Sequence, residues 1–341
     1  MNTLVQRVAA AILSLWLMLS ALAACGSFQK ETPADAPETA ATLEHVREDV
    51  FMKATDCIHF LNTGNSDAIL LESDGHFAMV DAGEDTDNPR GFPELELEGF
   101  EQKVLTYLKS HAADAQGKVH LDFVLGTHAH SDHLGGFDTI LADPDVTVDR
   151  AYLKKYDSSR INDAENTEWD NQEVYDQTIA ALRARNIPVI SEMNNTPFQL
   201  GNFKITLLNT DDPAVEEKVG ENDQSVGMLI EKNGTRIFLG ADLEDATGDL
   251  TRLAPQIGKV DLFKLCHHGI DGNNPAFLIQ ALMPRICVLT SYDAQHNKES
   301  RARIKDICDA QTYLTGVEDG VLAVIGDKGE IEVFGHIHND T

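Results

Sequence analysis

The sequence predicts an α/β protein in which two β-sheets pack face to face and helices cover their outer sides, an αββα sandwich. Three features indicate this fold. Short apolar runs of strand length come first, strand–helix units follow them, and this order occurs twice along the chain. No linker-like segment interrupts residues 55–341, so we expect one domain there.

The first half of this domain begins with apolar runs of strand length at residues 57–61, 68–72 and 77–80. Asp74-Gly75 supplies a tight turn between the last two, which indicates antiparallel pairing. Apolar residues at helical spacing within residues 100–108 predict a helix, and the next strand is expected at 121–125. Two further strands and the helix between them are expected at residues 151–153, 189–190 and 171–186.

The second half contains a hairpin over residues 225–240, because two apolar runs face each other across Asn233-Gly234, a strong two-residue turn signal. Strands are then expected at 261–266 and 286–291, and a last hairpin occupies roughly residues 321–334.

The strand at 121–125 leads directly into GTHAHSDHLGG, residues 126–136, which contains His128, His130, Asp132 and His133 in the pattern HxHxDH. From the composition, this pattern would arise by chance about two times in a thousand. Imidazole nitrogen and carboxylate oxygen suit Zn²⁺, with Mn²⁺ or Fe also admissible, and the lack of thiols disfavours a structural zinc finger.

The spacing within this motif indicates two metal ions. His128 and His130, two residues apart, can face one ion, whereas Asp132 and His133, beyond a sharp turn, can face a second. Further ligands must come from distant strand ends on the same rim, and Asp242 and His268 each follow a predicted strand.

Four motifs in this order, VDAG at residues 80–83, HxHxDH, GAD at 240–242 and HHG at 267–269, resemble those of the metallo-β-lactamase fold hydrolases across residues 56–334. The third-motif histidine of that family has no counterpart, and Glu221-Asn222-Asp223-Gln224-Ser225 stands in its place. The competence-protein branch of the fold shares this departure.

Longer stretches resemble the catalytic module of the teichoic-acid phosphorylcholine esterases of choline-binding proteins. They are SDAILLESDGHFAMVDAGED, YLKKYDSSRI, WDN at 169–171 and IGKVDLFK before the histidine pair. The resemblance implies a binuclear metal-dependent hydrolase of phosphodiesters.

The same resemblance implies the ligand sets: His128, His130 and Asp242 for the first ion; Asp132, His133, Asp242 and His268 for the second. Catalytic roles are expected for His267, Asp132 and Asp81. His267 would face the substrate phosphate and protonate the leaving alkoxide, and Asp81 would support the metal ligands from behind. The alternatives are a turn carboxylate for Asp81 and a packing or capping histidine for His267, and which of His267 and His268 binds metal stays open.

Three residues are candidate substrate contacts. Lys154 could contact the phosphate, and Asn222 lies in the segment that stands in place of the family's third motif. Trp169 could form an aromatic box for a quaternary ammonium group together with Tyr152, Tyr156 and Tyr175. The alternative for most of these aromatic residues is core packing.

The N-terminus predicts export. Residues 1–24 carry Arg7 and then an apolar run, and LAAC at 22–25 resembles a bacterial lipobox, so we expect a signal peptide, acylation of Cys25 and a flexible lipid-anchored tether over residues 25–54. The alternative is a membrane-spanning helix. The protein is expected outside the cytoplasm, held at the membrane only by this anchor, with its other four cysteines as free buried thiols.

The formal net charge of −29 disfavours nucleic acid as a partner, because no stripe of Lys and Arg is present to meet phosphates. We therefore expect a phosphorylcholine-like or other envelope phosphodiester as substrate. The alternatives are a metal-binding lipoprotein without turnover, a nuclease, and a lactam or ester hydrolase.

Overall fold

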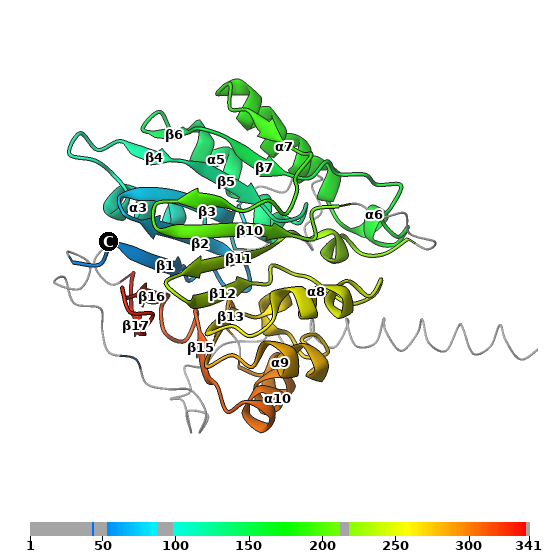
Figure 1. Ribbon diagram of the computed structural model, residues 1–341. Helices are drawn as coiled ribbons and strands as arrows, with labels where there is room; N and C mark the ends of the chain where they lie inside the picture. The colour runs from blue at the N-terminus through cyan, green and yellow to red at the C-terminus, as the bar shows by residue number, and fades with distance from the viewer. Residues whose placement is uncertain (1–42, 44–52, 87–97, 212–217, 293, 339–341) are drawn as a thin grey trace, which may run out of the picture. The chain divides into compact units, whose positions relative to one another are not determined.

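The computed structural model describes residues 43, 53–86, 98–211, 218–292 and 294–338 (Figure 1). The chain divides into two compact units, Met1–Glu38 and Thr39–Thr341, and every described residue belongs to the second. The predicted signal peptide, Cys25 and nearly all of the predicted tether lie outside the described residues. In the part of the chain that is described, no helix has both the length and the apolar character needed to cross a membrane.

The first sheet has eight strands in the order β17-β16-β1-β2-β3-β5-β7-β8. Their bounds are β1 Asp56–Phe60, β2 Ala68–Ser73, β3 His76–Ala82, β5 Phe123–Gly126, β7 Ala151–Leu153, β8 Val189–Ile190, β16 Val321–Ile325 and β17 Ile331–Gly335. Strands β1, β2 and β3 form an antiparallel meander, whereas β3, β5, β7 and β8 are parallel. The predicted early strands and the last hairpin are thereby confirmed.

The second sheet has seven strands in the order β15-β14-β13-β12-β11-β10-β9. Their bounds are β9 Phe198–Leu200, β10 Phe203–Leu208, β11 Gly227–Lys232, β12 Thr235–Leu239, β13 Leu262–Lys264, β14 Ile286–Leu289 and β15 Gln311–Leu314. The predicted hairpin is confirmed: Lys232 pairs with Thr235, and Asn233 and Gly234 have φ of 50° and 90°, as a type I′ turn requires. A separate two-stranded sheet joins β4 Val119–Leu121 to β6 Val146–Val148.

Three buried clusters separate four layers. In β1, Ile58 and Phe60 face the core between the sheets, whereas Cys57 lies in the core beneath the helices on the outer side, because successive side chains of a strand point to opposite faces. Helices α3 Glu101–His111, α5 Phe137–Ala142 and α7 Asn171–Ala184 cover the first sheet, and α8 Asp249–Ile257, α9 Ala276–Leu282 and α10 Lys298–Ile307 cover the second (Figure 1). The predicted αββα sandwich is confirmed.

The cysteines of the described residues carry free thiols: Cys57, Cys266 and Cys287 are buried, as expected, whereas Cys308 is partly exposed. Burial raises the pKa of the Cys57, Cys266 and Cys287 thiols, so these groups stay protonated at neutral pH when no cation is bound.

Candidate metal centre

Ligand-type side chains gather where loops leave the central strands of both sheets. Strands β3 and β5 run parallel in one sheet, as do β12 and β13 in the other, so the loops that follow them emerge at a common edge within each sheet. The histidine motif with α4 Ser131–Leu134 follows β5, Asp242 follows β12, and the 3-10 turn η3 Cys266–Gly269 follows β13.

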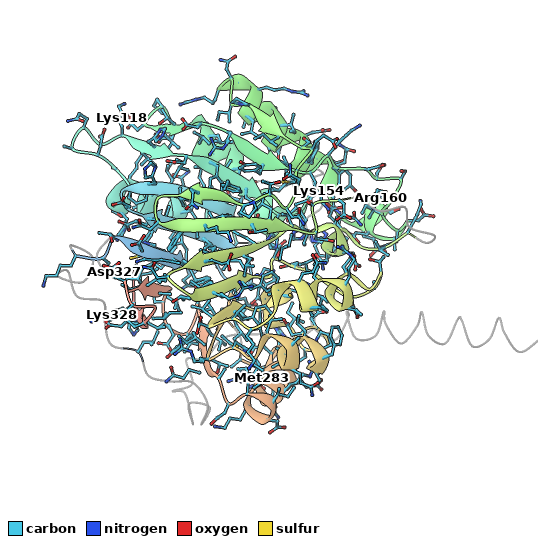
Figure 2. All side chains as sticks on the ribbon, viewed as in Figure 1. Lys118, Lys154, Arg160, Met283, Asp327 and Lys328 are labelled. Atoms are coloured by element: carbon cyan, nitrogen blue, oxygen red, sulfur yellow. The ribbon has the colours of Figure 1, made fainter. Side chains whose placement is uncertain are left out.

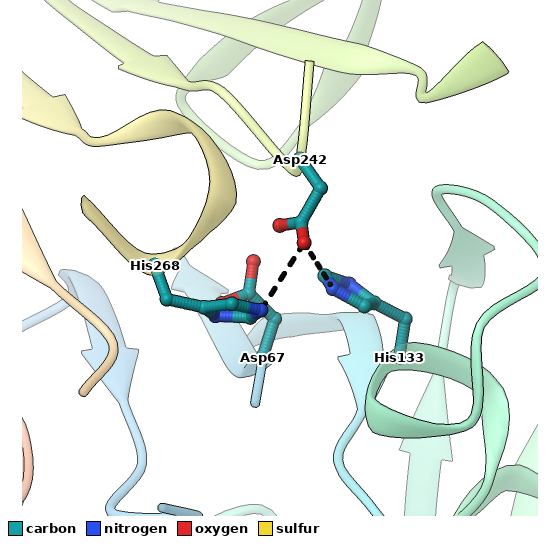
Figure 3. Close-up of side chains that lie close together, drawn as sticks. All are labelled: Asp67, His133, Asp242 and His268. Carbon is teal, nitrogen blue, oxygen red and sulfur yellow. Dashed lines mark ion pairs between the residues drawn. The ribbon is translucent and has the colours of Figure 1, made fainter. Parts of the chain in front are cut away.

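Asp67, His133, Asp242 and His268 form one cluster whose ligand atoms all lie within 4.8 Å of one another (Figure 3). Oδ2 of Asp242 lies 3.2 Å from Nε2 of His133 and 3.2 Å from Nε2 of His268. Oδ2 of Asp132 lies 3.1 Å from Nε2 of His268 and 3.8 Å from Nε2 of His133. The four ligands expected for the second ion are therefore together.

The donor set of this cluster fits a divalent cation. Four atoms held tetrahedrally at about 2.0–2.2 Å from Zn²⁺ lie roughly 3.3–3.6 Å apart, close to the separations found. Nε2 of His133 and Oδ1 of Asp242 are buried without a hydrogen-bond partner. Burial acts to lower the pKa of His133 and of His268, but the nearby carboxylates, Asp242 foremost, raise both pKa values well above normal. Such a negative environment favours a cation.

Asp67 is a residue that sequence reasoning missed. Its Oδ1 lies 3.2 Å from Nδ1 of His268, the nitrogen that faces away from Asp242, and accepts a 2.5 Å hydrogen bond from the Thr290 hydroxyl. Its Oδ2 forms an ion pair with the fully buried Lys264 ammonium, which is also 3.8 Å from Oδ1 of Asp242. Asp67 thus orients His268 rather than competing for the same ion.

The electrostatics of Asp67 follow from these partners. Burial acts to raise its pKa, but the charges of Lys264 and His268 hold that pKa below its usual range, so the carboxylate stays ionised. Both Asp67 and Lys264 stood inside stretches of sequence that carried the family resemblance, yet an isolated Asp and an isolated Lys carry no spacing signal of their own.

Asp81 lies behind His133. Its Oδ2 is 2.8 Å from Nδ1 of His133, and it also accepts hydrogen bonds from the backbone N–H and the hydroxyl of Thr127, both at 2.8 Å. The side chain is fully buried. Asp81 therefore acts through the orientation of His133, and the structure gives it no route to a substrate.

His128 and His130 are the histidines expected for the first ion. Nε2 of His128 lies 3.1 Å from Nδ1 of His130, and the rings of His128 and His133 are 4.1 Å apart. The group of ligand atoms around Asp242 that lie within 4.8 Å of one another contains neither His128 nor His130. The position expected for the first ion is thus less closely assembled than the second.

His267 faces the same space with a different nitrogen. Its Nδ1 lies 2.9 Å from Oε1 of Glu244 and 2.8 Å from Nδ2 of Asn273, which leaves Nε2, 3.8 Å from Oδ2 of Asp242, directed at the centre. Nε2 of His268 lies closer to Asp242 than Nε2 of His267 does, and it also lies beside Asp132, so the geometry favours His268 as the ligand. Glu244, two residues beyond Asp242, is a second residue that sequence reasoning missed.

Four residues of this region have a strained backbone conformation. Asp81, Ala241, His267 and His268 have φ of 56°, 45°, 48° and 52°, in the left-handed region that non-glycine residues seldom adopt. Such conformations persist where the surrounding fold fixes them, and they cluster at functional sites.

A cavity of about 800 Å³ opens beside these groups. It is lined by His130, Asp132, Asp242 and His267 from the centre, by Asn222, by the aromatic residues Phe100, Trp169 and Tyr292, and by Glu84, Glu98, Glu165 and Lys103, among others. Trp169 is 43% exposed and stacks on His130 with ring centroids 5.9 Å apart. Trp169 and Asn222 therefore lie where substrate contacts were expected.

The other expected substrate contacts do not line this cavity. Lys154 is buried, and its ammonium donates to the carbonyl of Asp211 at 3.4 Å (Figure 2). Tyr152 stacks on Phe198, because its position in β7 turns it to the core between the sheets. Tyr156 and Tyr175 pack against the helix-side core. Lys154 and these three tyrosines thus lie outside the lining of this cavity, and their roles as substrate contacts stay predictions.

A sequence model of the family described as "Beta-lactamase superfamily domain" matches residues 78–265. The chain belongs to this family. The match ends two residues before His267, so the histidine pair lies just beyond it. Within the superfamily, the His/Asp cluster able to hold metal ions is consistent with a metal-dependent hydrolase.

The chain is similar to one curated protein and to two solved structures, among others. ComE operon protein 3 of Bacillus subtilis (strain 168) is 24% identical over 178 residues, which cover 52% of this chain and 21% of that protein, so the chain spans about a fifth of its length. The metallo-β-lactamase fold protein YhfI of Bacillus subtilis is 14% identical over 81% of this chain and 98% of its own, with a TM-score of 0.46. Zn²⁺-bound PqqB of Methylobacterium extorquens is 15% identical over 73% and 84%, with a TM-score of 0.39.

The third superfamily motif is replaced by the 3-10 turn η2 Glu221–Gln224. Oε1 of Glu221 accepts the Ala129 N–H at 3.0 Å, and the Glu221 N–H donates to Oε1 of Glu165 at 3.0 Å. The same Glu165 oxygen lies 2.9 Å from Nε2 of His130. Glu221 thus ties this turn to the histidine loop, and Glu165, also missed from the sequence, positions His130.

Proposed function

We propose that this metal-dependent hydrolase is a phosphodiesterase with a binuclear centre. The observation that carries the proposal is the arrangement around Asp242: His133, His268 and Asp132 on one side, the His128–His130 pair beside them, and an open cavity in front. Zn²⁺ suits these nitrogen and oxygen ligands best, and Mn²⁺ or Fe also fits.

The residues of the first ion would be His128, His130 and Asp242, and those of the second Asp132, His133, Asp242 and His268. When bound there, two divalent cations supply a hydroxide near neutral pH and neutralise the nonbridging oxygens of a phosphate. Asp81, Asp67 and Glu165 hold the imidazoles of His133, His268 and His130 in place.

His267 is suited to the role of general acid. The Glu244 carboxylate can accept a hydrogen bond from Nδ1, so Nε2 faces the cavity beside Asp242, within reach of a leaving oxygen. Donation from Nε2 to the departing alkoxide completes cleavage of the ester bond. Asn222 also lines the cavity, and its Nδ2 donates to Oε1 of Glu244 at 3.3 Å, so it supports the carboxylate that contacts His267.

The cavity walls support a substrate with a cationic head group, such as a phosphorylcholine ester. Trp169, Phe100 and Tyr292 offer aromatic faces to a quaternary ammonium group, and the Glu98 and Glu165 carboxylates add negative charge. Burial raises the pKa of Glu84 to about 8, so Glu84 is mostly neutral at pH 7 and contributes little charge. The net charge of −29 and the lack of a stripe of Lys and Arg in the sequence disfavour nucleic acid as a substrate.

The N-terminal sequence indicates where in the cell this reaction would take place. We propose that residues 1–24 direct export, that acylated Cys25 anchors the chain, and that residues 25–54 tether the hydrolase domain 55–341 to the membrane outside the cytoplasm. There it would meet phosphodiesters of envelope polymers or small molecules.

The test is a substrate panel on the full chain loaded with Zn²⁺ or Mn²⁺. We expect turnover of bis(p-nitrophenyl) phosphate and of p-nitrophenyl phosphorylcholine, and little or none of a chromogenic lactam or of single-stranded DNA. Asp132→Ala and His268→Ala should lose metal and turnover together, whereas the exposed His120→Ala should keep both.

The alternative readings predict other outcomes. DNA digestion with Mn²⁺ would indicate a nuclease, and lactam opening would indicate a lactamase. A metal-loaded protein that turns over none of these compounds would contradict the proposal and favour a metal-binding lipoprotein.

A further inference from the structure

A second cluster of metal-ligating side chains lies on the outer face of the first sheet, away from the centre described above. Cys57 and His59 of β1 and Glu72 of β2 bring a thiol, an imidazole and a carboxylate within 4.8 Å of one another. Cys57 and Glu72 are direct cross-strand partners, and His59 lies two residues from Cys57 on the same face.

This cluster cannot share an ion with the binuclear centre. Glu72 is five residues along the chain from Asp67, which is roughly 16 Å at the rise of a strand. The cluster also lies beneath α3, because Cys57 belongs to the buried cluster that contains Tyr107 and Leu108 of that helix.

The imidazole of His59 is held in the way that metal-bound histidines usually are. Its Nδ1 lies 2.8 Å from the hydroxyl of Tyr107, whose ring stacks on His111 at 3.9 Å. The Tyr107 hydroxyl thereby fixes the ring, and Nε2 is directed at Oε2 of Glu72, 3.3 Å away. Most metal-bound histidines are oriented by a hydrogen bond at the ring nitrogen that does not bind the metal.

The distances and charges fit Zn²⁺. A separation of 3.3 Å between nitrogen and oxygen is that of two tetrahedral ligands about 2.0 Å from a shared Zn²⁺. A thiolate and a carboxylate together carry two negative charges, which a divalent cation neutralises in a buried setting where His59 is fully enclosed. The Glu72 side chain is 20% exposed, so a water molecule can reach the fourth position from that side.

We propose that Cys57, His59 and Glu72 form a second, mononuclear Zn²⁺ site, separate from the binuclear centre, that links β1 to β2 beneath α3. Binding replaces the thiol proton of Cys57, which is released to solvent as the Zn–S bond forms. Helix α3 covers the site, and the site does not line the cavity beside Asp242.

Co²⁺ is the probe that separates this site from the binuclear centre, whose predicted ligands include no thiol. We expect the full chain, stripped of metal and titrated with Co²⁺, to bind three ions and to show thiolate-to-Co²⁺ charge-transfer absorption. Cys57→Ser should bind two ions and lose that absorption, whereas Cys308→Ser should keep it. His268→Ala should lose ions from the binuclear centre yet keep the absorption.

Glu72→Gln is a second variant of nearly unchanged size at a partly exposed position, so it tests the site even if Cys57→Ser fails to fold. We expect it to weaken the Co²⁺ binding that gives the thiolate absorption by tenfold or more. Two ions per wild-type chain with no thiolate absorption would overturn the proposal. So would a thiolate absorption that Cys57→Ser or Glu72→Gln leaves unchanged.

Discussion

Oδ2 of Asp81 lies 2.8 Å from Nδ1 of His133, and both side chains are fully buried. This contact fixes the ring of His133 so that the opposite nitrogen faces Asp242. Asp81→Asn should therefore weaken metal binding about 10- to 100-fold while leaving the fold intact. Competition with a chelator measures this; unchanged affinity would mean that Asp81 is only a turn carboxylate.

Lys264 should matter for stability as much as for chemistry. Its ammonium is the buried counterion of Asp67 and lies 3.8 Å from Asp242. Lys264→Met leaves buried carboxylates without compensation and should cost about 3–5 kcal/mol of unfolding free energy in the metal-free protein.

Lys204→Met is the matched control, because Lys204 forms a surface ion pair with Glu231 at 2.9 Å and should cost less than about 1 kcal/mol. Urea unfolding of both variants measures the difference. Equal losses would show that the buried Lys264 has no special electrostatic role.

His267 should affect chemistry without affecting metal content. Because its Nε2 is placed to protonate a leaving oxygen, His267→Gln should slow hydrolysis of an unactivated alkyl phosphodiester about 10²- to 10⁴-fold. A nitrophenyl ester, whose leaving group needs no proton, should lose much less.

Glu244→Gln should give the same pattern more weakly, because Glu244 acts on His267 through Nδ1. Hydrolysis rates on the alkyl and nitrophenyl esters, with metal content measured in parallel, test whether His267 is a general acid. Loss of metal in His267→Gln would identify His267 as a ligand instead.

Trp169 should determine head-group preference. Its exposed ring borders the cavity, so Trp169→Ala should raise KM about tenfold for a phosphorylcholine ester and leave KM for bis(p-nitrophenyl) phosphate nearly unchanged. Tyr156→Phe, at a buried position outside the cavity, should change neither KM. A parallel rise for both esters in Trp169→Ala would argue against a cation contact.

Glu84 gives the metal-free protein a pH-dependent stability. Burial raises its pKa to about 8, whereas the unfolded chain ionises it near 4.5. Between these values the folded state binds the extra proton, so this contribution to stability is present at low pH and is lost as pH rises from about 4.5 to 8.

Glu84→Gln should therefore reduce the fall in unfolding free energy across that range, and the exposed Glu168→Gln should not. Chemical unfolding at several pH values between 5 and 8 provides the measurement. An unchanged slope in Glu84→Gln would show that Glu84 ionises normally in the folded protein.

Local patterns predicted the parts of this molecule that local physics controls. The Asn233-Gly234 turn needs two residues at positive φ, and the sequence supplies both. The ligands of the HxHxDH run lie next to one another because they are neighbours in the chain. The same patterns did not predict strands β9 and β10 or helices α8, α9 and α10, although α8 places Leu250, Leu253 and Ile257 on one buried face.

Residues that act through long-range contacts could not be predicted in this way. Asp67 meets Lys264 from 197 positions away, and Glu165 reaches His130 across 35. Nearness in sequence also did not bring the aromatic residues together, because Tyr152 packs against the core between the sheets, whereas Phe100 and Tyr292 reach the cavity beside Trp169 from distant parts of the chain. Only the fold brings such pairs together.

Anomalous X-ray scattering from crystals of the Zn²⁺-loaded protein tests the binuclear centre most directly. We expect two neighbouring peaks, one among Asp132, His133, Asp242 and His268 and the other beside His128 and His130, with Asp242 between them. A single ion in this region, or ions that avoid Asp242, would contradict the account.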